Sequence, residues 1–240
     1  MSKSTTSFGF QDVPFGEKKP LVKEVFESVA KNYDVMNDAM SFGVHRWWKK
    51  ELIEFLHPRP TQHLLDIAGG TGDIASAFLK AGGGKATIVD INKAMLAAGK
   101  KKFPSLNFTY GDGEELPFPD CAFDCAANAF GLRNMTDIPK ALAEAHRVIK
   151  PGSLFCTLEF SKVSIPLLDK IYDAYSFNAI PFLGEKIAGD RAAYQYLVES
   201  IRRFPPQEEL QDLFKAAGFQ RTGYFNLTGG VVAIHYGWRI

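Results

Sequence analysis

Short apolar segments alternate with amphipathic ones from residue 61 to the end of the chain, and this alternation restricts the possible folds. Strand-like runs cover residues 63–68, 85–89, 107–110, 123–127 and 153–160, and a terminal hairpin is expected over residues 220–227 and 231–239. Helical periodicity covers residues 20–33, 47–56, 74–81, 93–102, 138–149 and 207–217. Strands separated by helices form βαβ units, so we predict an α/β fold with a mostly parallel sheet and helices on both faces.

The chain divides into three segments of different character. Residues 1–19 lack the apolar core of a secretion signal, and we expect a flexible lead-in there. Residues 20–60 form a helical preface, which is a candidate lid over the sheet. Residues 61–240 form the sheet domain, with a helical insert at about residues 165–206 that is expected to break near Pro181.

Composition and charge exclude several classes of function. Lys and Arg total 28, Asp and Glu total 27, and the net charge of +1 gives no basic surplus that would indicate a nucleic-acid partner. Cys121, Cys125 and Cys156 have neither the number nor the spacing of a disulfide framework or a zinc site, so we expect no metal. No apolar run reaches the roughly 18 residues of a membrane span. Unpaired cysteines are typical of a reducing compartment, and we expect a cytoplasmic protein.

The most specific local motif is LLDIAGGTGD at residues 64–73, where a predicted strand runs into a glycine-rich turn and then a helix. Gly70, Gly72 and Ala75 satisfy G-x-G-x-x-G/A, a pattern typical of dinucleotide sites. Glycine lets the backbone approach a ligand, and the helix N-terminus supplies N–H donors. A P-loop is excluded because no G-K-[ST] follows. The turn predicts an adenosine ligand, whose class the pattern leaves open.

Three carboxylates in succession narrow the class of ligand. Asp66 lies within the first strand of the sheet domain, where it would repel a pyrophosphate and attract a cationic amino-acid group. Asp90 ends the second strand, where a carboxylate can accept both ribose hydroxyls, and Asp112 follows the third, where it can accept an adenine amino group. With no lysine or arginine expected nearby, the set favours a sulfonium ligand. The alternatives are that Asp66 bonds its own loop, Asp90 caps a helix and Asp112 sets a turn.

Further segments are similar to those of one known family. They are FESVAKNYDVMNDAMSFGVHRWWK, VDIN, ELPFPD, FDCAANAFGLRNMTD, HRVIKPGS, LEFSK, YDAYSF, YQYLVESIRRFP and NLTGGVVAIHYG. Together with the glycine loop, they resemble the ubiquinone/menaquinone biosynthesis C-methyltransferase (UbiE-type) family of class I S-adenosylmethionine-dependent methyltransferases. The resemblance implies a Rossmann-like fold with a seven-stranded, mostly parallel sheet whose last strand is antiparallel. It also implies methyl transfer from S-adenosylmethionine to a ring carbon of a polyprenylated quinol.

The resemblance assigns cofactor-binding roles to residues of this chain. It places Thr71 in the glycine loop, Asp90 at the ribose, and Asp112 with Gly113 at the adenine; the loop motif adds Gly70 and Gly72, and the charge argument adds Asp66. The chain departs from some members at Asp112-Gly113, where an Asn-Ala pair occurs, and at Ala129, where a serine can contribute a hydroxyl. The first departure keeps a hydrogen-bond acceptor.

Methylation of a quinol ring carbon requires the neighbouring hydroxyl to lose its proton, because the phenolate makes that carbon nucleophilic. Arg133 and Asn134 follow the fourth strand, at the edge where open α/β sheets bind ligands. We expect the Arg133 guanidinium to stabilise a phenolate, directly or through a water, and Asn134 to hold the ring oxygen. A structural ion pair is the alternative for Arg133. Tyr33, in the polar break at residues 32–45, is a further candidate, with core packing as its alternative.

Aromatic residues are candidates for a channel that takes the polyprenyl tail, although aromatic residues at helical spacing more often belong to a core. The candidates are Phe42, Trp47, Trp48, Tyr172, Tyr175, Phe177, Phe182 and Leu183. His45, beside the tryptophan pair, is expected to be structural. Because a prenylated substrate resides in a bilayer, we expect peripheral contact at the inner face of the cytoplasmic membrane.

The sequence therefore predicts S-adenosylmethionine-dependent C-methylation of 2-methoxy-6-polyprenyl-1,4-benzoquinol, of demethylmenaquinol, or of both. Two alternatives stay open: another small-molecule O- or N-methyltransferase, and a non-catalytic cofactor-binding scaffold of a quinone-biosynthesis complex. A homodimer is also compatible with the sequence. An NAD-dependent dehydrogenase is the least supported alternative.

Overall fold

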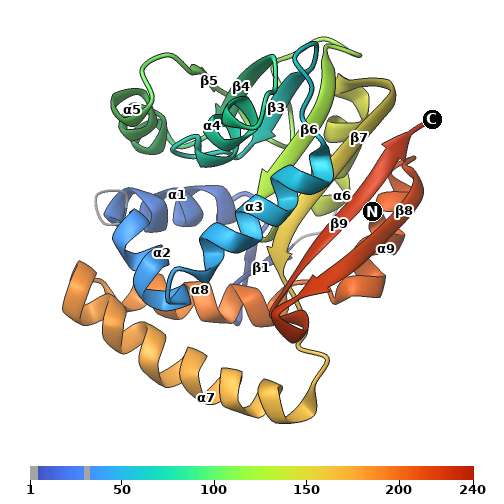
Figure 1. Ribbon diagram of the computed structural model, residues 1–240. Helices are drawn as coiled ribbons and strands as arrows, with labels where there is room; N and C mark the ends of the chain where they lie inside the picture. Colours follow the sequence, from blue (N-terminus) through green and yellow to red (C-terminus); the bar gives the residue numbers. More distant parts are fainter. Residues whose placement is uncertain (1–4, 30–32) are drawn as a thin grey trace.

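The structure, a computed structural model, describes residues 5–29 and 33–240. A seven-stranded sheet with the order β5–β4–β3–β6–β7–β9–β8 forms its centre (Figure 1). The strands are β3 (His63–Ile67), β4 (Lys85–Asp90), β5 (Asn107–Tyr110), β6 (Phe123–Ala129), β7 (Ile149–Phe160), β8 (Gln220–Leu227) and β9 (Val232–Arg239). Strands β3 to β7 pair in parallel, and β9 pairs antiparallel with both β7 and β8. The predicted α/β sheet with an antiparallel last strand is confirmed.

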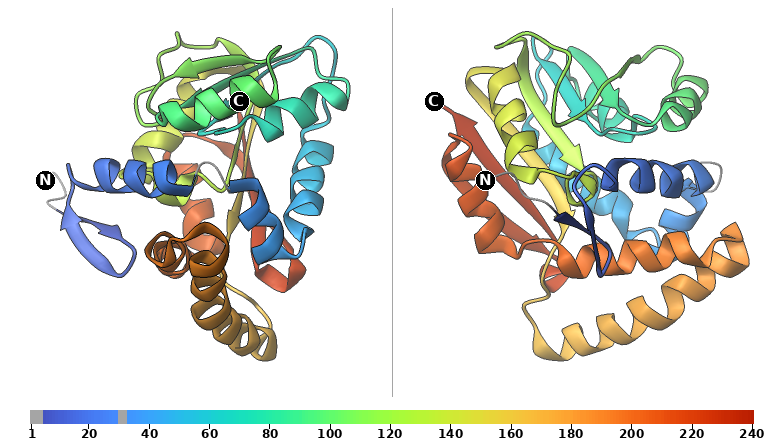
Figure 2. Two further views of the ribbon diagram at one scale, coloured as in Figure 1. Left: turned by 90° about the vertical axis from the view of Figure 1, so that its left-hand side faces the viewer. Right: turned by 180° about the vertical axis from the view of Figure 1, so that it is seen from behind.

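Helices cover both faces of this sheet. Helices α3 (Val44–Leu56), α4 (Asp73–Lys80) and α5 (Lys93–Lys102) lie on one face, and α6 (Ile138–Val148) and α9 (Gln207–Ala216) lie on the other (Figures 1 and 2). Leu64 and Leu65 are both fully buried but belong to opposite clusters, because successive strand side chains point to opposite faces. This two-sided burial explains why the strands read as continuous apolar runs.

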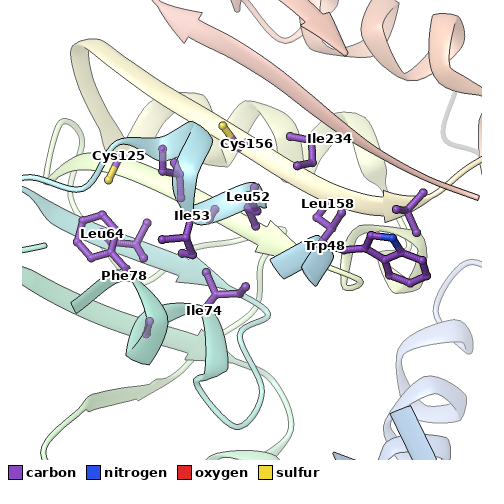
Figure 3. Close-up of a cluster of buried hydrophobic side chains, with 14 of the residues drawn as sticks. Trp48, Leu52, Ile53, Leu64, Ile74, Phe78, Cys125, Cys156, Leu158 and Ile234 are labelled. Carbon is purple, nitrogen blue, oxygen red and sulfur yellow. The ribbon is translucent and has the colours of Figure 1, made fainter. Parts of the chain in front are cut away.

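The first buried cluster joins α3 to the sheet domain. Trp48, Leu52 and Ile53 of α3 lie with Ile74 and Phe78 of α4 over the strands (Figure 3). Helix α3, the last part of the helical preface, is therefore part of the main core.

The N-terminal region departs from two expectations. The flexible lead-in is wrong for residues 5–14, which form an antiparallel hairpin of β1 (Thr5–Phe8) and β2 (Gln11–Pro14). The ring of Phe8 stacks on that of Tyr196 with 4.2 Å between centroids, and this contact fixes the hairpin on the molecule. Helix α1 (Lys18–Val29) follows close to the predicted position.

The predicted polar break is also wrong, because α2 (Tyr33–Ser41) occupies most of it. Its Asn and Asp residues have low helix propensity, but tertiary contacts override it. Met40 packs against the buried cluster around Ile180, and its carbonyl accepts a hydrogen bond of 3.1 Å from the Tyr175 hydroxyl. Contacts with a distant helix thus stabilise a segment that reads locally as a loop.

The predicted insert consists of α7 (Pro166–Leu183), a π-helical turn (Gly184–Ala188) and α8 (Arg191–Arg203). The predicted break near Pro181 is wrong, since α7 continues through it. Pro181 lies in the last turn, where the loss of one backbone hydrogen bond is offset by packing of its buried neighbour Ile180. Helices α1, α2, α7 and α8 lie beyond the carboxyl ends of the parallel strands (Figure 1). Within the described residues, no helix combines the length and apolarity needed to cross a membrane.

Candidate active site

A cavity of about 220 Å³ lies at the carboxyl ends of β3, β4 and β6, where open α/β sheets bind ligands. Its polar part is formed by the glycine loop and by carboxylates that follow the strands. Its apolar part is lined by Val22, Val29, Trp48, Phe130, Phe160 and Tyr172. The cavity thus joins a polar compartment to an aromatic one.

The glycine loop comes close to two carboxylates. A Cβ atom on Gly69 would lie 2.5 Å from the carboxyl carbon of Asp66, so a side chain there would displace the buried acid. Gly70 adopts a φ of +55°, and its N–H donates to Asp90 Oδ2 at 2.9 Å. The loop is therefore held open toward the cavity by its own glycines. The dinucleotide pattern did not single out Gly69, although its neighbour Gly70 was predicted.

Thr71 and Gly113, which were also predicted to bind the cofactor, line the cavity, whereas Gly72 is not among the residues that line it. Gly72 has a φ of +87° and starts α4, with the ring of Phe108 against its Cα. A Cβ on Gly113 would lie 2.5 Å from Met135 Cε, so this glycine permits close packing beneath the cavity. The structure therefore gives Gly72 a conformational role.

Asp66 is fully buried and only partly bonded. Its Oδ2 accepts a hydrogen bond from Ala75 N at 3.1 Å, whereas Oδ1 has no hydrogen-bond partner among the described residues. Burial raises the pKa of Asp66 to about 7. A buried acceptor without a donor is costly, so Asp66 suits a ligand that brings an N–H group or a cation.

Asp90 organises the turn after β4. Its Oδ2 accepts from Gly70 N and its Oδ1 accepts from Asn92 N at 2.7 Å. Burial raises the pKa of Asp90. The cap of α5 is Asn92, whose Oδ1 accepts from the N–H groups of Ala94 and Met95, so Asp90 is not the helix cap. Each carboxylate oxygen has a second lone pair, which can accept from a ribose diol.

Asp112 contradicts the expectation that no cation lies near the carboxylates. Its Oδ2 is 2.6 Å from the Nζ atom of Lys19, which also lies 3.0 Å from Glu114 Oε2. Asp112 Oδ1 accepts from Glu114 N at 2.9 Å, as the turn-setting alternative predicted. Lys19 belongs to α1, outside the sheet domain. The order of residues along the chain therefore does not indicate that its ammonium group lies beside Asp112. Asp66 and Asp90 remain the carboxylates of this set that suit a cationic ligand, although Lys49, which pairs with Asp73, also lines the cavity.

Arg133 lies in a short 3₁₀ turn, Leu132–Asn134, where it forms the ion pair of the structural alternative and also lines the cavity. Its Nη1 donates to Glu159 Oε1 at 2.9 Å and to the Phe130 carbonyl, in an ion pair whose side chains are 5% and 0% exposed. Its guanidinium carbon lies 5.5 Å from the centroid of the Phe160 ring. Arg133 also lines the cavity, and its Nε is buried without a hydrogen bond to any described residue. The structural ion pair therefore holds the guanidinium at the cavity wall.

Asn134 lines the same wall. Its Oδ1 accepts a hydrogen bond of 3.0 Å from the Tyr196 hydroxyl, and its Nδ2 lies 3.4 Å from the Phe130 carbonyl. Burial raises the pKa of Tyr196 to about 12, so the phenol stays a donor at neutral pH. Tyr33 begins α2, but its side chain lies outside the described residues, and its role stays a prediction.

The aromatic candidates for the tail separate into two groups. Trp48 and Tyr172 line the cavity. Phe42, Trp47, Phe177 and Phe182 are exposed, and Tyr175 and Leu183 pack around the buried cluster of Ile180 and Tyr194. Only the first group is placed to contact a molecule in the cavity, together with Phe130 and Phe160, which the sequence analysis did not select.

His45 has a hydrogen-bond partner and also lines the cavity, so its structural role stays a prediction. Its Nε2 lies 2.8 Å from Asp38 Oδ1, and Asp38 also pairs with Arg46. Burial lowers the pKa of His45, with the Asp38 hydrogen bond opposing this. In the described part of the chain, no cluster of three or more His, Cys, Asp or Glu side chains is arranged to hold a metal ion.

Several residues of this site were not found by sequence reasoning. Glu159 had a usable signal, because an acidic residue within the apolar strand segment LEF must be bonded where it is buried. Lys18, Lys19 and Tyr196 had none, because they come from helices whose docking is decided by tertiary packing.

Comparisons with known proteins agree with this geometry. The model of the ubiE/COQ5 methyltransferase family matches residues 13–239. The chain is 50% identical to the ubiquinone/menaquinone biosynthesis C-methyltransferase UbiE of Acidiphilium cryptum, over 100% of this chain and 98% of that protein. It is also 50% identical to the mitochondrial 2-methoxy-6-polyprenyl-1,4-benzoquinol methylase of Danio rerio, over 98% of this chain and 85% of that protein.

Solved structures show the same fold at low sequence identity. A SAM-dependent methyltransferase from Thermotoga maritima, described as a possible histamine N-methyltransferase, superposes with a TM-score of 0.65 at 22% identity, covering 90% of this chain and 99% of that one. Phosphoethanolamine N-methyltransferase 2 of Haemonchus contortus, solved with S-adenosyl-L-methionine, has a TM-score of 0.55 at 20% identity, covering 75% and 38%. At this identity the likeness establishes the class I methyltransferase fold alone.

Proposed function

The chain belongs to the ubiE/COQ5 methyltransferase family, and from this premise we propose that it transfers a methyl group from S-adenosylmethionine to a ring carbon of a polyprenylated quinol. The observation that carries the proposal is the two-part cavity. A carboxylate-lined compartment suited to a cationic nucleoside adjoins an aromatic compartment with Arg133 in its wall. The names of its relatives, which include a benzoquinol methylase, support this substrate class.

The residues at the polar end fit S-adenosylmethionine. Asp66 Oδ1 is a buried acceptor that lacks a hydrogen-bond donor among the described residues, which suits the amino group of the methionine part. In this proposal Asp90 accepts from the ribose diol, Asp112 accepts from the adenine amino group, and the backbone at Gly70 and Thr71 approaches the ligand closely; all four residues line the cavity. When bound, S-adenosylmethionine supplies an electrophilic methyl group on a sulfonium.

At the aromatic end, the residues of the chain hold and activate the ring. Trp48, Phe130 and Phe160 surround it with apolar surface and exclude water, which strengthens electrostatic interactions inside the cavity. The Arg133 guanidinium stabilises the phenolate that forms when the quinol hydroxyl loses its proton to water. Asn134, oriented by the Tyr196 hydroxyl, holds the ring oxygen. The Tyr33 side chain is proposed as a further contact.

The direct test is methyl transfer by the purified protein. We expect transfer of labelled methyl from S-adenosylmethionine to a ring carbon of a reduced short-chain prenyl benzoquinol, demethylmenaquinol, or both. The oxidised quinones are the matched control and should give no product, because they have no hydroxyl to ionise. Product methylated on oxygen would favour the O-methyltransferase alternative, and binding of the cofactor with no product from either quinol would favour the scaffold.

The substrate class has consequences outside the cavity. The tail of a prenylated quinol lies in lipid, so we propose that the protein contacts a membrane surface peripherally when it takes up substrate. A homodimer or a larger quinone-biosynthesis complex stays a prediction.

Removal of the Asp90 carboxylate should weaken cofactor binding selectively. For Asp90→Ala we expect the Kd for S-adenosylmethionine, measured by isothermal titration, to rise about 10- to 100-fold, or about 1.4–2.7 kcal/mol. The change removes the acceptors for the diol and the bond that holds Gly70 N. Asp212→Asn, at an exposed pair with Lys215, is the control and should bind normally. Unchanged affinity in Asp90→Ala would show that the ribose lies elsewhere.

A further inference from the structure

Lys18 is a buried lysine that bonds the backbone of the Arg133 turn. Its side chain lies at the start of α1, and the residue is 4% exposed. The Nζ atom donates to the carbonyl oxygen of Met135 at 2.8 Å and to that of Arg133 at 3.3 Å. More than a hundred residues separate Lys18 from these carbonyls in the sequence. A buried ammonium group is costly unless it is hydrogen-bonded, so the Lys18 ammonium is expected to keep its bonds to these two carbonyls.

Side chains of β6, β7 and the loop after β5 bond the N–H groups of the same turn, while Tyr196 of α8 bonds the Asn134 side chain and Thr6 bonds the Thr136 carbonyl. The Arg133 N–H donates to Glu159 Oε2 at 3.2 Å, the Leu132 N–H donates to Asn128 Oδ1 at 3.0 Å, and the Thr136 N–H donates to Glu114 Oε1 at 2.6 Å. These acceptors bind the N–H groups of the turn, whereas Lys18 binds its carbonyls. The turn is thus held between the sheet and α1.

Lys18 lies outside the substrate cavity. It lines a second, polar cavity of about 300 Å³, which it shares with Arg133, Thr136, Tyr196, Ser200 and Glu209. Arg133 lines both cavities, whereas Lys18 lines the second cavity and is not among the residues that line the first. Its effect on a molecule in the first cavity must act through the turn.

We propose that Lys18 is a positioning residue for methyl transfer, whose ammonium group fixes the Arg133–Met135 backbone and thereby the direction of the Arg133 guanidinium. The next residue, Lys19, bonds Asp112 and Glu114 at the cofactor side. The first turn of α1 therefore joins the loop that would hold the adenine to the turn that would activate the quinol. The inference rests on the proposed function, because it gives Arg133 its role.

The charge of Lys18 is sensitive to alkaline pH. Burial lowers its pKa to about 8, and Glu114 opposes this. Glu114 interacts electrostatically with Lys18, and Arg133, Tyr196, Arg203 and Glu209 are the other charged or titratable groups that line the same second cavity. The ammonium is present below about pH 8 and is lost as the pH rises through that value, so its bonds to the two carbonyls weaken on the alkaline side.

The test compares Lys18→Met and Lys18→Arg with the wild-type protein. We expect Lys18→Met to lower kcat about 10- to 100-fold, because the turn loses hydrogen bonds made by a charged group. The KM for quinol and the Kd for S-adenosylmethionine should be nearly unchanged. Lys18→Arg should restore part of kcat and move the alkaline decline of kcat above pH 8, because a guanidinium stays charged. Lys50→Met removes an exposed lysine paired with Glu54 and is the matched control, expected to behave as wild type.

Amide hydrogen exchange gives a readout that does not depend on the reaction. Exchange at residues 132–136 should be faster in Lys18→Met than in wild type, and near wild type in Lys18→Arg. Normal kcat in a folded Lys18→Met protein, or an alkaline limb that Lys18→Arg leaves in place, would overturn the inference. If Lys18→Met does not fold, the pH profiles of wild type and Lys18→Arg decide. A wild-type protein inactive on both quinols would contradict the proposed function, while the exchange result would still report on Lys18.

Discussion

Replacing Arg133 with methionine is expected to lower kcat for quinol methylation by about 10²- to 10³-fold, with the Kd for S-adenosylmethionine within about twofold of wild type. The guanidinium lies in the wall between the aromatic residues and the buried Glu159, so under the proposed function we expect it to act in surroundings from which water is excluded. A charge there stabilises a developing phenolate more strongly than a charge in water. Single-turnover kinetics with the reduced quinol, and titration of the cofactor, measure the two quantities separately.

The same substitution leaves Glu159 buried without its partner and is expected to destabilise the protein. A control must therefore separate the loss of stability from the loss of kcat. The double variant Arg133→Met with Glu159→Gln removes both charges and should recover stability without recovering kcat. Arg191→Met, which breaks an exposed pair with Glu185, should leave both kcat and stability near wild type. If Arg133→Met methylates at the wild-type rate while folded, Arg133 has only its structural role, and another group must stabilise the phenolate.

The sheet was predictable because its information is local. The inner parallel strands β3, β4 and β6 are largely buried on both faces and end near a glycine, an acid or a turn, so their apolar runs and boundaries appear together in the sequence. Residues 107–110 and 93–102 were predicted with their observed boundaries. The carboxylates near the ends of three successive strands were predicted to serve one ligand. Asp66 in β3, Asp90 at the end of β4 and Asp112 after β5 do line one cavity, because the carboxyl ends of parallel strands share one edge.

The errors fall where long-range contacts decide. Helix α2 contains residues that favour turns, and it is helical because α3 and α7 pack against it. The hairpin at residues 5–14 forms against α8, through Phe8 and Tyr196. Lys19 and Asp112 are 93 positions apart in the sequence. The spacing of residues therefore could not show that the expectation of no lysine near the carboxylates was wrong. The resemblance to a family identified the reaction, but it did not show that Arg133 is held by Glu159.

The buried pair itself leads to the second large effect. Glu159→Leu is expected to lower the free energy of unfolding by about 3–5 kcal/mol, because it leaves the Arg133 guanidinium buried without its carboxylate. The residue is fully buried, and its two oxygens accept from the Arg133 side chain, the Arg133 N–H and the Phe160 N–H. Urea denaturation, with the slope compared between variants, measures the loss.

The double variant Arg133→Met with Glu159→Leu separates charge from packing. Apolar residues of similar volume often replace a buried ion pair with little loss of stability, so this protein should recover most of the 3–5 kcal/mol while remaining inactive. Glu185→Leu, at the exposed pair with Arg191, should change stability by about 1 kcal/mol or less. If Glu159→Leu loses no more free energy of unfolding than the exposed control Glu185→Leu does, the Arg133–Glu159 pair is not desolvated in solution. In that case the Arg133 guanidinium would also be solvated, and it would not stabilise a phenolate more strongly than a charge in water does.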